Sequence, residues 1–236
     1  MVFVVDPTAP VVDGPDVRHL LDVLRLRPGE AVIAADGRGR WVPCRVAASA
    51  PAKGSRGADP TGLLVPDGPA VADPMGVPEL TVAFAPTKGD RPEWVVQKLT
   101  ELGVDRIVPL RTSRSVVRWD GDRAARSVER LRRVVREAAG QCRRARLPEV
   151  TDVSRLEDLA GVAGVPVALA DAGGQAPDLA RPLVAVGPEG GWDPAERDAF
   201  GPTVGLGATV LRAETAAVTA GALLCALRNG VVLPLA

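Results

Sequence analysis

The chain has 236 residues, of which 46% are hydrophobic, a length and composition that suit one large domain or two modest ones. Aromatic residues make up only 3% and tyrosine is absent, which argues against a nucleic-acid surface built on stacked aromatic rings. The formal net charge is zero, which argues against non-specific polyanion binding by the molecule as a whole.

The first seventy residues are typical of a small β-barrel with one helix. The stretch DVRHLLDVLRLRPGE has apolar residues at helical spacing and ends at Pro-Gly, which predicts a helix with a buried face at Val17, Leu20, Leu21 and Leu24. The stretch AVIAADGRGRWVPCRVAAS has two apolar runs around Asp-Gly, which predicts a hairpin, and GLLVPDG adds a short strand. A linker rich in Pro and Gly follows at 73–79.

From Leu80 onward, strands and helices alternate. Strands are expected at 80–86, 104–110, 165–170, 183–187 and 203–207, and helices at 91–103, 122–141 and 216–228. A further short helix is expected to begin at Asp193-Pro194, with Glu196 in the capping-box position. The alternation predicts an α/β fold with a parallel sheet that is covered on both faces.

Arginines are concentrated between residues 106 and 146, where acidic residues are few. On the helix expected there, Arg126, Arg133 and Arg136 lie opposite the apolar stripe of Leu131. This segment is either a solvated helix face or a strip that binds phosphates with salt-sensitive affinity.

Two glycine-rich loops each follow an expected strand. In VGPEGGW, Gly187, Gly190 and Gly191 permit positive φ or close approach of the backbone to a ligand. The loop matches neither the P-loop nor the G-x-G-x-x-G pattern, so it is either a tight turn or a different kind of ligand site. LGATVLRAETA repeats the arrangement, with Glu214 or Thr215 expected to cap the next helix. Since ligands of open α/β sheets bind beyond the carboxyl ends of strands, we expect a ligand between the two loops.

The cysteine and histidine content argues against a metal site. Cys44, Cys142 and Cys225 are far apart and form no C-x-x-C pair, so neither a disulfide framework nor a zinc site is expected. Such a pattern is typical of the reducing cytoplasm. His19 is the only histidine, and no apolar run reaches membrane-spanning length, so we expect no metal and no membrane partner.

The motifs GPEGG and LGATVLRAETA resemble the paired C-terminal motifs of the ribosomal RNA small-subunit methyltransferase E family, which belongs to the SPOUT superfamily. KGDRPEWVVQKLTELGVDRIVPLRTSRSVV, REAAGQCRRARLPEV and HLLDVLRLRPGE followed by ADGRG resemble further segments of the family, so the resemblance covers nearly the whole chain. It implies a PUA-like β-barrel domain at 1–72, a linker at 73–79, and a SPOUT α/β domain at 80–236 that contains a deep trefoil knot. Family members usually carry an arginine where this chain has Thr209.

The resemblance implies a homodimeric, cytoplasmic enzyme that uses S-adenosylmethionine to methylate N3 of a uridine in 16S ribosomal RNA, without a metal. The cofactor-binding residues that it implies are Leu169, Gly187, Pro188, Glu189, Gly190, Gly191, Leu206, Gly207, Leu211, Thr215 and Ala216. The rival interpretations are an RNA-binding module of the same fold without catalytic activity, and an enzyme that acts on a free nucleotide.

The expected chemistry requires that uracil N3 lose its proton before it attacks the methyl group. Glu189 and Glu214 are candidate bases because both lie in the glycine loops, and Arg212 is a candidate to stabilise the uracil anion. The alternatives are that Glu214 only caps a helix and that Arg212 only pairs with a carboxylate. The RNA-binding candidates are Arg25, Arg111, Arg114, Arg126, Arg133, Arg136, Gln141, Arg143 and Arg144.

Overall fold

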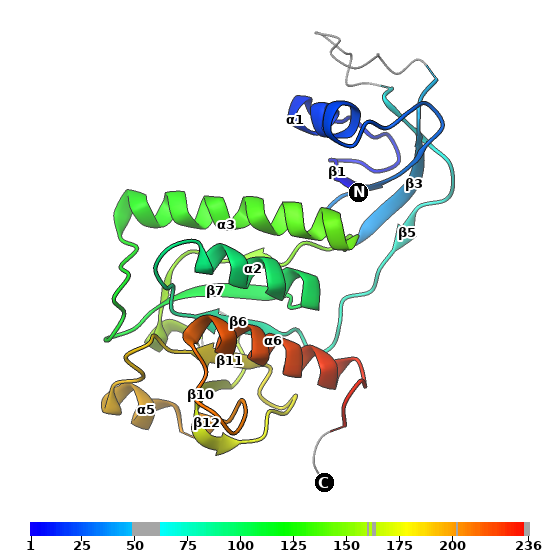
Figure 1. Ribbon diagram of the computed structural model, residues 1–236. Coiled ribbons are helices and arrows are strands. Elements are labelled where there is room, and N and C mark those ends of the chain that lie inside the picture. Colours follow the sequence, from blue (N-terminus) through cyan, green and yellow to red (C-terminus); the bar gives the residue numbers. More distant parts are fainter. Residues whose placement is uncertain (49–61, 160, 162–163, 202, 234–236) are drawn as a thin grey trace. The chain divides into compact units, whose positions relative to one another are not determined.

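The computed structural model describes residues 1–48, 62–159, 161, 164–201 and 203–233, and it contains two compact units (Figure 1). The first unit comprises residues 1–75 together with 139–147, and the second comprises 76–138 and 148–236. Among the described residues, no helix combines the length and the hydrophobicity needed to cross a membrane.

The first unit is built on one sheet. Its strands are β1 (Val2–Phe3), β2 (Ala31–Ala35), β3 (Arg40–Val46), β4 (Leu64–Pro66) and β5 (Val71–Ala72). The strand order is β1-β2-β3-β4, and β5 also pairs with β3. The predicted hairpin of β2 and β3 is confirmed, with Gly37 and Gly39 at positive φ in its turn. Among the described residues, these pairings do not close into a ring. The segment 139–147 packs here, where Leu147 N donates to Gly37 O at 2.9 Å.

The helix of the first unit begins and ends earlier than its apolar spacing predicts. α1 (Gly14–Arg18) is capped by the Asp13 side chain, and the chain continues as a π-helical turn, η1 (His19–Val23). Leu20 and Leu21 are buried as expected, whereas Leu24 is 47% exposed because the helix has already ended. The residue after Leu24, Arg25, adopts a left-handed φ of 57°. Expecting Leu24 on the buried face was therefore wrong.

The second unit contains the parallel sheet that the alternating pattern predicts. Its strands are β6 (Thr81–Phe84), β7 (Arg106–Arg111), β8 (Glu149–Val150), β9 (Ser154–Arg155), β10 (Val167–Gln175), β11 (Leu183–Val186) and β12 (Thr203–Val204). Their order is β12-β10-β11-β6-β7-β8, with β9 also paired to β7, and every pairing is parallel. The α/β class is thus confirmed, and the deep trefoil knot stays a prediction.

Helices and loops bury both faces of this sheet. Among the described residues, the helices of the second unit are α2 (Arg91–Leu102), α3 (Gly121–Cys142, whose residues from Ala139 onward belong to the first unit), η2 (Leu156–Asp158), α5 (Pro194–Phe200) and α6 (Ala213–Arg228). α2 packs on α6, which also contacts β6 and β11. A core cluster on the sheet joins Ala83 and Leu183 with Leu156 and Trp192. Side chains alternate between the two faces of a sheet along each strand. Every residue of β6 and β11 is buried, so both faces of the sheet are covered there.

Most helix ends follow their sequence signals. α2 ends at Gly103, which adopts a left-handed φ of 103°, and α5 begins with the Asp193–Glu196 capping box. α6 is different, because it begins at Ala213 and its N-cap, Arg212, makes no side-chain capping bond. Glu214 and Thr215 therefore lie within the first turn, and the expectation that either of them caps the helix is wrong.

The end of α6 is fixed by a buried ion pair. The Arg228 guanidinium pairs with the Asp105 carboxylate, and the two side chains are only 10% and 8% exposed. Arg228 also donates to Gly103 O at 2.8 Å and to Pro78 O at 3.3 Å. The Asp105 carboxylate in turn accepts a hydrogen bond from Leu80 N at 3.0 Å. This one arginine therefore holds α6 against the starts of β6 and β7.

Replacing Arg228 with methionine should lower the free energy of unfolding by about 3–5 kcal/mol, because it leaves the Asp105 carboxylate buried without its partner. The matched control is Lys98→Met, since Lys98 pairs with Glu101 on the exposed side of α2 and should cost no more than about 1 kcal/mol. Urea unfolding measures both. Equal losses in the two variants would contradict a special role for the buried pair.

Candidate functional site

The two glycine loops line one cavity of about 400 Å³ beside the middle of β10 and the end of β11. Of the predicted cofactor residues, those that line it are Gly187, Pro188, Glu189, Gly191, Leu206, Gly207, Leu211 and Ala216. Thr209 and Arg212 also line it. Leu169, Gly190 and Thr215 are outside this lining. Leu169 is fully buried in the core, and Gly190 lies beside Arg114.

Trp192 forms a fixed wall of the cavity that the sequence did not single out. Its indole Nε1 donates to Ala170 O at 2.9 Å, which joins the loop after β11 to β10. The ring lies against Gly187, where an added Cβ would be 3.1 Å from the indole. Glycine at position 187 therefore lets the indole pack closely on the backbone, and a larger residue would crowd the ring. The signal was the position of Trp192 directly after Gly-Gly in the motif.

The GPEGG loop is held by the segment that follows β7. Glu196 accepts from Ser113 N at 2.7 Å with one oxygen and from Asp193 N at 2.9 Å with the other. Arg114 donates to Gly190 O at 3.2 Å and lies 3.6 Å from the Asp193 carboxylate. Arg114, an RNA-binding candidate, therefore contacts the GPEGG loop itself.

Arg91 links the two glutamates of the glycine loops. Its Nη1 lies 4.0 Å from Glu189 Oε1, and its Nε lies 3.6 Å from Glu214 Oε1. The Glu214 side chain is 13% exposed, and its Oε2 is buried with no hydrogen-bond partner among the described residues. Sequence reasoning missed Arg91, since nothing in KGDRPEW indicates that the first residue of α2 meets loops encoded far along the chain.

The lining of the cavity fits the cofactor that the resemblance implies. Asp171, Glu189 and Arg212 are its charged residues, so its formal charge is −1. S-adenosylmethionine carries a sulfonium, an ammonium and a carboxylate, a net charge of +1. The apolar remainder, which includes Pro188, Trp192 and several aliphatic side chains, suits a flat ring such as adenine. Charge, lining and volume therefore suit S-adenosylmethionine.

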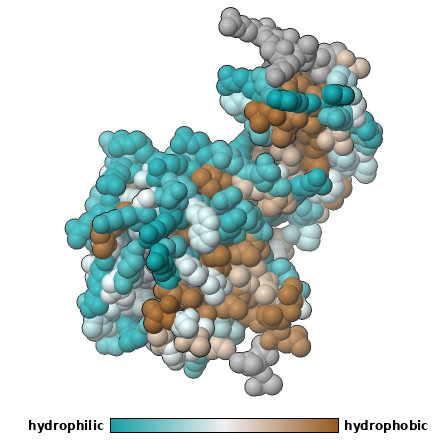
Figure 2. Space-filling view, in the orientation of Figure 1, coloured by the Kyte–Doolittle hydropathy of each residue, from teal (hydrophilic) through white to brown (hydrophobic). Residues whose placement is uncertain are grey.

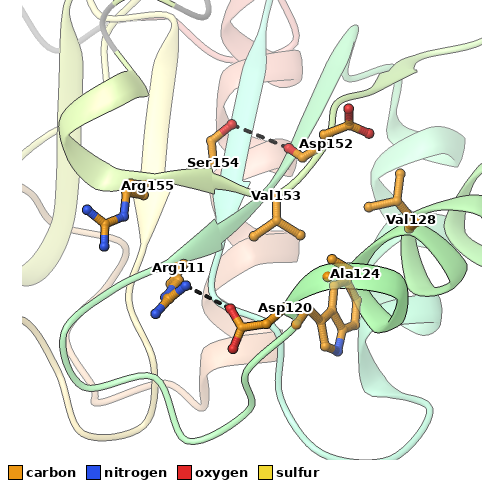
Figure 3. Close-up of a pocket in the computed structure, with 11 residues that line it drawn as sticks. Arg111, Asp120, Ala124, Val128, Asp152, Val153, Ser154 and Arg155 are labelled. Carbon is orange, nitrogen blue, oxygen red and sulfur yellow. Dashed lines mark hydrogen bonds and ion pairs between the residues drawn. The ribbon is translucent and has the colours of Figure 1, made fainter.

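The RNA-binding candidates of the second unit do not line one common hollow. Arg126 and Arg133 line a hollow with Lys88, Arg123 and Arg130. Arg111 lines another, where it pairs with Asp120 at 2.7 Å (Figure 3). Arg136 is exposed on α3. Arg114 contacts the GPEGG loop, and the other four candidates belong to the first unit: Arg25, Gln141, Arg143 and Arg144.

Comparisons with known proteins give a consistent result. A family model described as the RNA methyltransferase domain matches residues 75–225, and one described as the RNA methyltransferase PUA domain matches residues 12–51. A protein from Mycobacterium bovis named ribosomal RNA small subunit methyltransferase E is 37% identical over 227 residues, which cover 89% of this chain and 83% of the relative.

Two solved structures are similar along almost the whole chain. One is a ribosomal RNA small subunit methyltransferase E from Neisseria gonorrhoeae bound to S-adenosylmethionine, with a TM-score of 0.77, 28% identity, and coverage of 95% of this chain and 96% of that chain. The other is a putative methyltransferase from Legionella pneumophila in complex with the same cofactor, with a TM-score of 0.77, 26% identity and the same coverage.

Gly207 and Gly190 should differ in their effect on cofactor binding. Gly207 lines the cavity with a φ of 147°, which side-chain-bearing residues rarely adopt, so Gly207→Val should raise the Kd for S-adenosylmethionine about tenfold or more. Gly190→Val is the control, because Gly190 does not line the cavity and a Cβ there would meet Arg114 at an ordinary 3.5 Å. Calorimetric titration measures both, and unchanged binding in the Gly207 variant would mean that the site lies elsewhere.

Proposed function

The chain belongs to the RNA methyltransferase family, and on that premise we propose that it transfers a methyl group from S-adenosylmethionine to N3 of a uridine in 16S ribosomal RNA of the small ribosomal subunit. The observation that carries the proposal is the cavity between the two glycine loops, whose charge complements that of the cofactor. A cofactor-free RNA-binding module would have no use for this cavity. An enzyme of free nucleotides would have no use for the PUA domain. The named relatives are bacterial, and bacterial ribosomal RNA lies in the cytoplasm, so we propose that the protein acts there.

Three charged side chains take different parts in the proposed reaction. S-adenosylmethionine supplies a methyl group attached to a cationic sulfur. Because Glu189 and Arg212 line the cavity, we propose that Glu189 accepts the N3 proton and that Arg212 stabilises the uracil anion. Glu214 does not line the cavity, and it contacts Arg91, which also meets Glu189. We therefore assign Glu214 and Arg91 as positioning residues.

We also propose that the protein is a homodimer formed through the second unit. Figure 2 shows hydrophobic side chains gathered around the C-terminal part of that unit. Val210, Val231 and Leu233 are 94%, 75% and 83% exposed, while α6 has half-buried apolar residues beside its buried face. A contiguous exposed apolar surface is typical of a protein–protein interface, and the resemblance implies a dimer of this domain.

The proposed reaction is tested by mass spectrometry of nucleosides from 16S ribosomal RNA incubated with the protein and S-adenosylmethionine. We expect N3-methyluridine, and we expect Glu189→Gln to lower kcat by about 10²–10⁴-fold because the base is lost. The affinity for S-adenosylmethionine should fall far less. The proposed function is contradicted if no methylated nucleoside forms. The assignment of Glu189 alone is contradicted if the variant keeps its kcat.

The dimer is tested by sedimentation at micromolar concentration. The parent should sediment as a dimer. Replacing both Val231 and Leu233 with aspartate should yield a folded monomer, since both side chains are exposed in the single chain and charge opposes their burial between chains. Lys98→Asp is the control for added negative charge, since the Lys98 side chain is 34% exposed and lies on α2, outside the C-terminal residues. A monomeric parent would contradict the proposal.

A further inference from the structure

A strongly basic hollow of about 510 Å³ lies outside the cofactor cavity. Its walls come from Thr87, Lys88 and Gly89, from the segment before α3, and from the first turns of α3. The cations that line it are Lys88, Arg123, Arg126, Arg130 and Arg133, and the lining includes no acidic residue.

Most of this charge has no counter-charge within the protein. Arg130 pairs with Glu93 at 2.5 Å. The other four cations make no hydrogen bond or ion pair with any residue that the structure describes. Like charges gathered around one concavity repel each other, and a bound anion removes that repulsion. The hollow is therefore suited to a ligand with several negative charges.

The hollow drawn in Figure 3 differs from the basic hollow because its positive charges are neutralised by acidic residues. Its two arginines, Arg111 and Arg155, pair with Asp120 at 2.7 Å and with Glu157 at 3.0 Å. Its lining also contains two aspartates, Asp120 and Asp152. The two hollows share the wall residue Trp119, yet only the basic hollow has an excess of cations without partners.

The basic hollow lies on the same edge of the sheet as the cofactor cavity. Lys88 follows β6 and the GPEGG loop follows β11, and these two strands are parallel neighbours, so both loops leave the sheet on one side. Two residues after Gly89, Arg91 lies 4.0 Å from Glu189 of the cavity. A strand of RNA can therefore place its backbone in the hollow and a base near the cavity.

We propose that the basic hollow binds backbone phosphates of the RNA strand next to the nucleotide that is methylated. This inference rests on the proposed function. Of the arginines between residues 106 and 146, it assigns phosphate binding only to those that line the hollow. It adds Lys88, which lies outside that segment, and it leaves out Arg136. Phosphate contacts fix the position of a strand without reading its sequence, so the hollow positions the substrate while the cavity selects the reacting base.

The test compares two variants with equal loss of charge. Lys88→Gln with Arg123→Gln removes two cations of the hollow that have no partner, and Lys98→Gln with Arg155→Gln removes two that are ion-paired elsewhere. Binding of a 16S ribosomal RNA transcript is measured against salt concentration. The slope of log K against log salt is negative, and each lost phosphate contact should reduce its magnitude by about 0.7–0.9. The magnitude should therefore fall by about 1.5 in the hollow variant and hardly change in the control.

The catalytic readout separates this inference from the proposed function. For the hollow variant we expect a higher KM for RNA, an unchanged kcat, and an unchanged Kd for S-adenosylmethionine. If the parent methylates the transcript but the hollow variant matches the control in slope and KM, the inference is overturned and the proposed function stands. If the parent binds the transcript with the expected slopes but does not methylate it, the proposed function fails.

Two competitors test the class of ligand. Inorganic phosphate at millimolar concentration should displace the transcript only weakly, and polyglutamate should compete less well than a uridine-containing single-stranded RNA of matched charge. If polyglutamate competes as well as that RNA, and if its competition is lost to the same extent in the hollow variant, the hollow is a general polyanion site and the assignment to RNA is overturned. Full displacement by phosphate alone would identify a site for free phosphate and also overturn it.

Discussion

Every paired strand of the second unit runs in the same direction, so the loops after β6, β7, β11 and β12 all leave the sheet on one edge. The functional features of the unit depend on this constraint. It brings the two glycine loops together around a cavity, places Lys88 on the neighbouring strand end, and allows Ser113, which follows β7, to bond with Glu196. The sheet also shields the backbone hydrogen bonds of its strands, so these loops start from a rigid base.

The charges along this edge are segregated by sign. The cofactor cavity has a formal charge of −1, and the basic hollow beside it holds five cations. A cationic cofactor and an anionic nucleic acid would each find the complementary surface, with little attraction to the wrong one. Arg91, two residues after Gly89 of the basic hollow, pairs with the glutamates of both glycine loops, so it links the positions of these loops.

The sequence predicted those parts of the fold that have strong local signals. Apolar periodicity located α2 and α3, and the Asp193–Glu196 pair located the start of α5. The two-residue strands β8 and β9 were missed because they are too short to carry a periodic pattern. The early start of α6 was missed because its N-cap, Arg212, makes no side-chain capping bond and so gives no recognisable signal.

In the candidate site, too, the sequence predicted the residues that have a local signal and missed those that have none. Glycine at a strand end is a local signal, and eight of the predicted cofactor residues line the cavity. Arg91 pairs with glutamates that are distant in the sequence, and Lys88 lines a hollow with arginines of α3, and no local pattern reveals either placement.

Glu196 illustrates how such a contact would constrain the divergence of related sequences. One carboxylate oxygen closes the capping box of α5 and the other accepts from the backbone amide of Ser113. Since a backbone amide is present in every residue but proline, position 113 can change freely among relatives while the bond survives. Position 196 has no such freedom, because only a side chain with two acceptor oxygens at that reach serves both partners. The two residues share one hydrogen bond, yet they would leave opposite marks in an alignment, one variable and one nearly fixed.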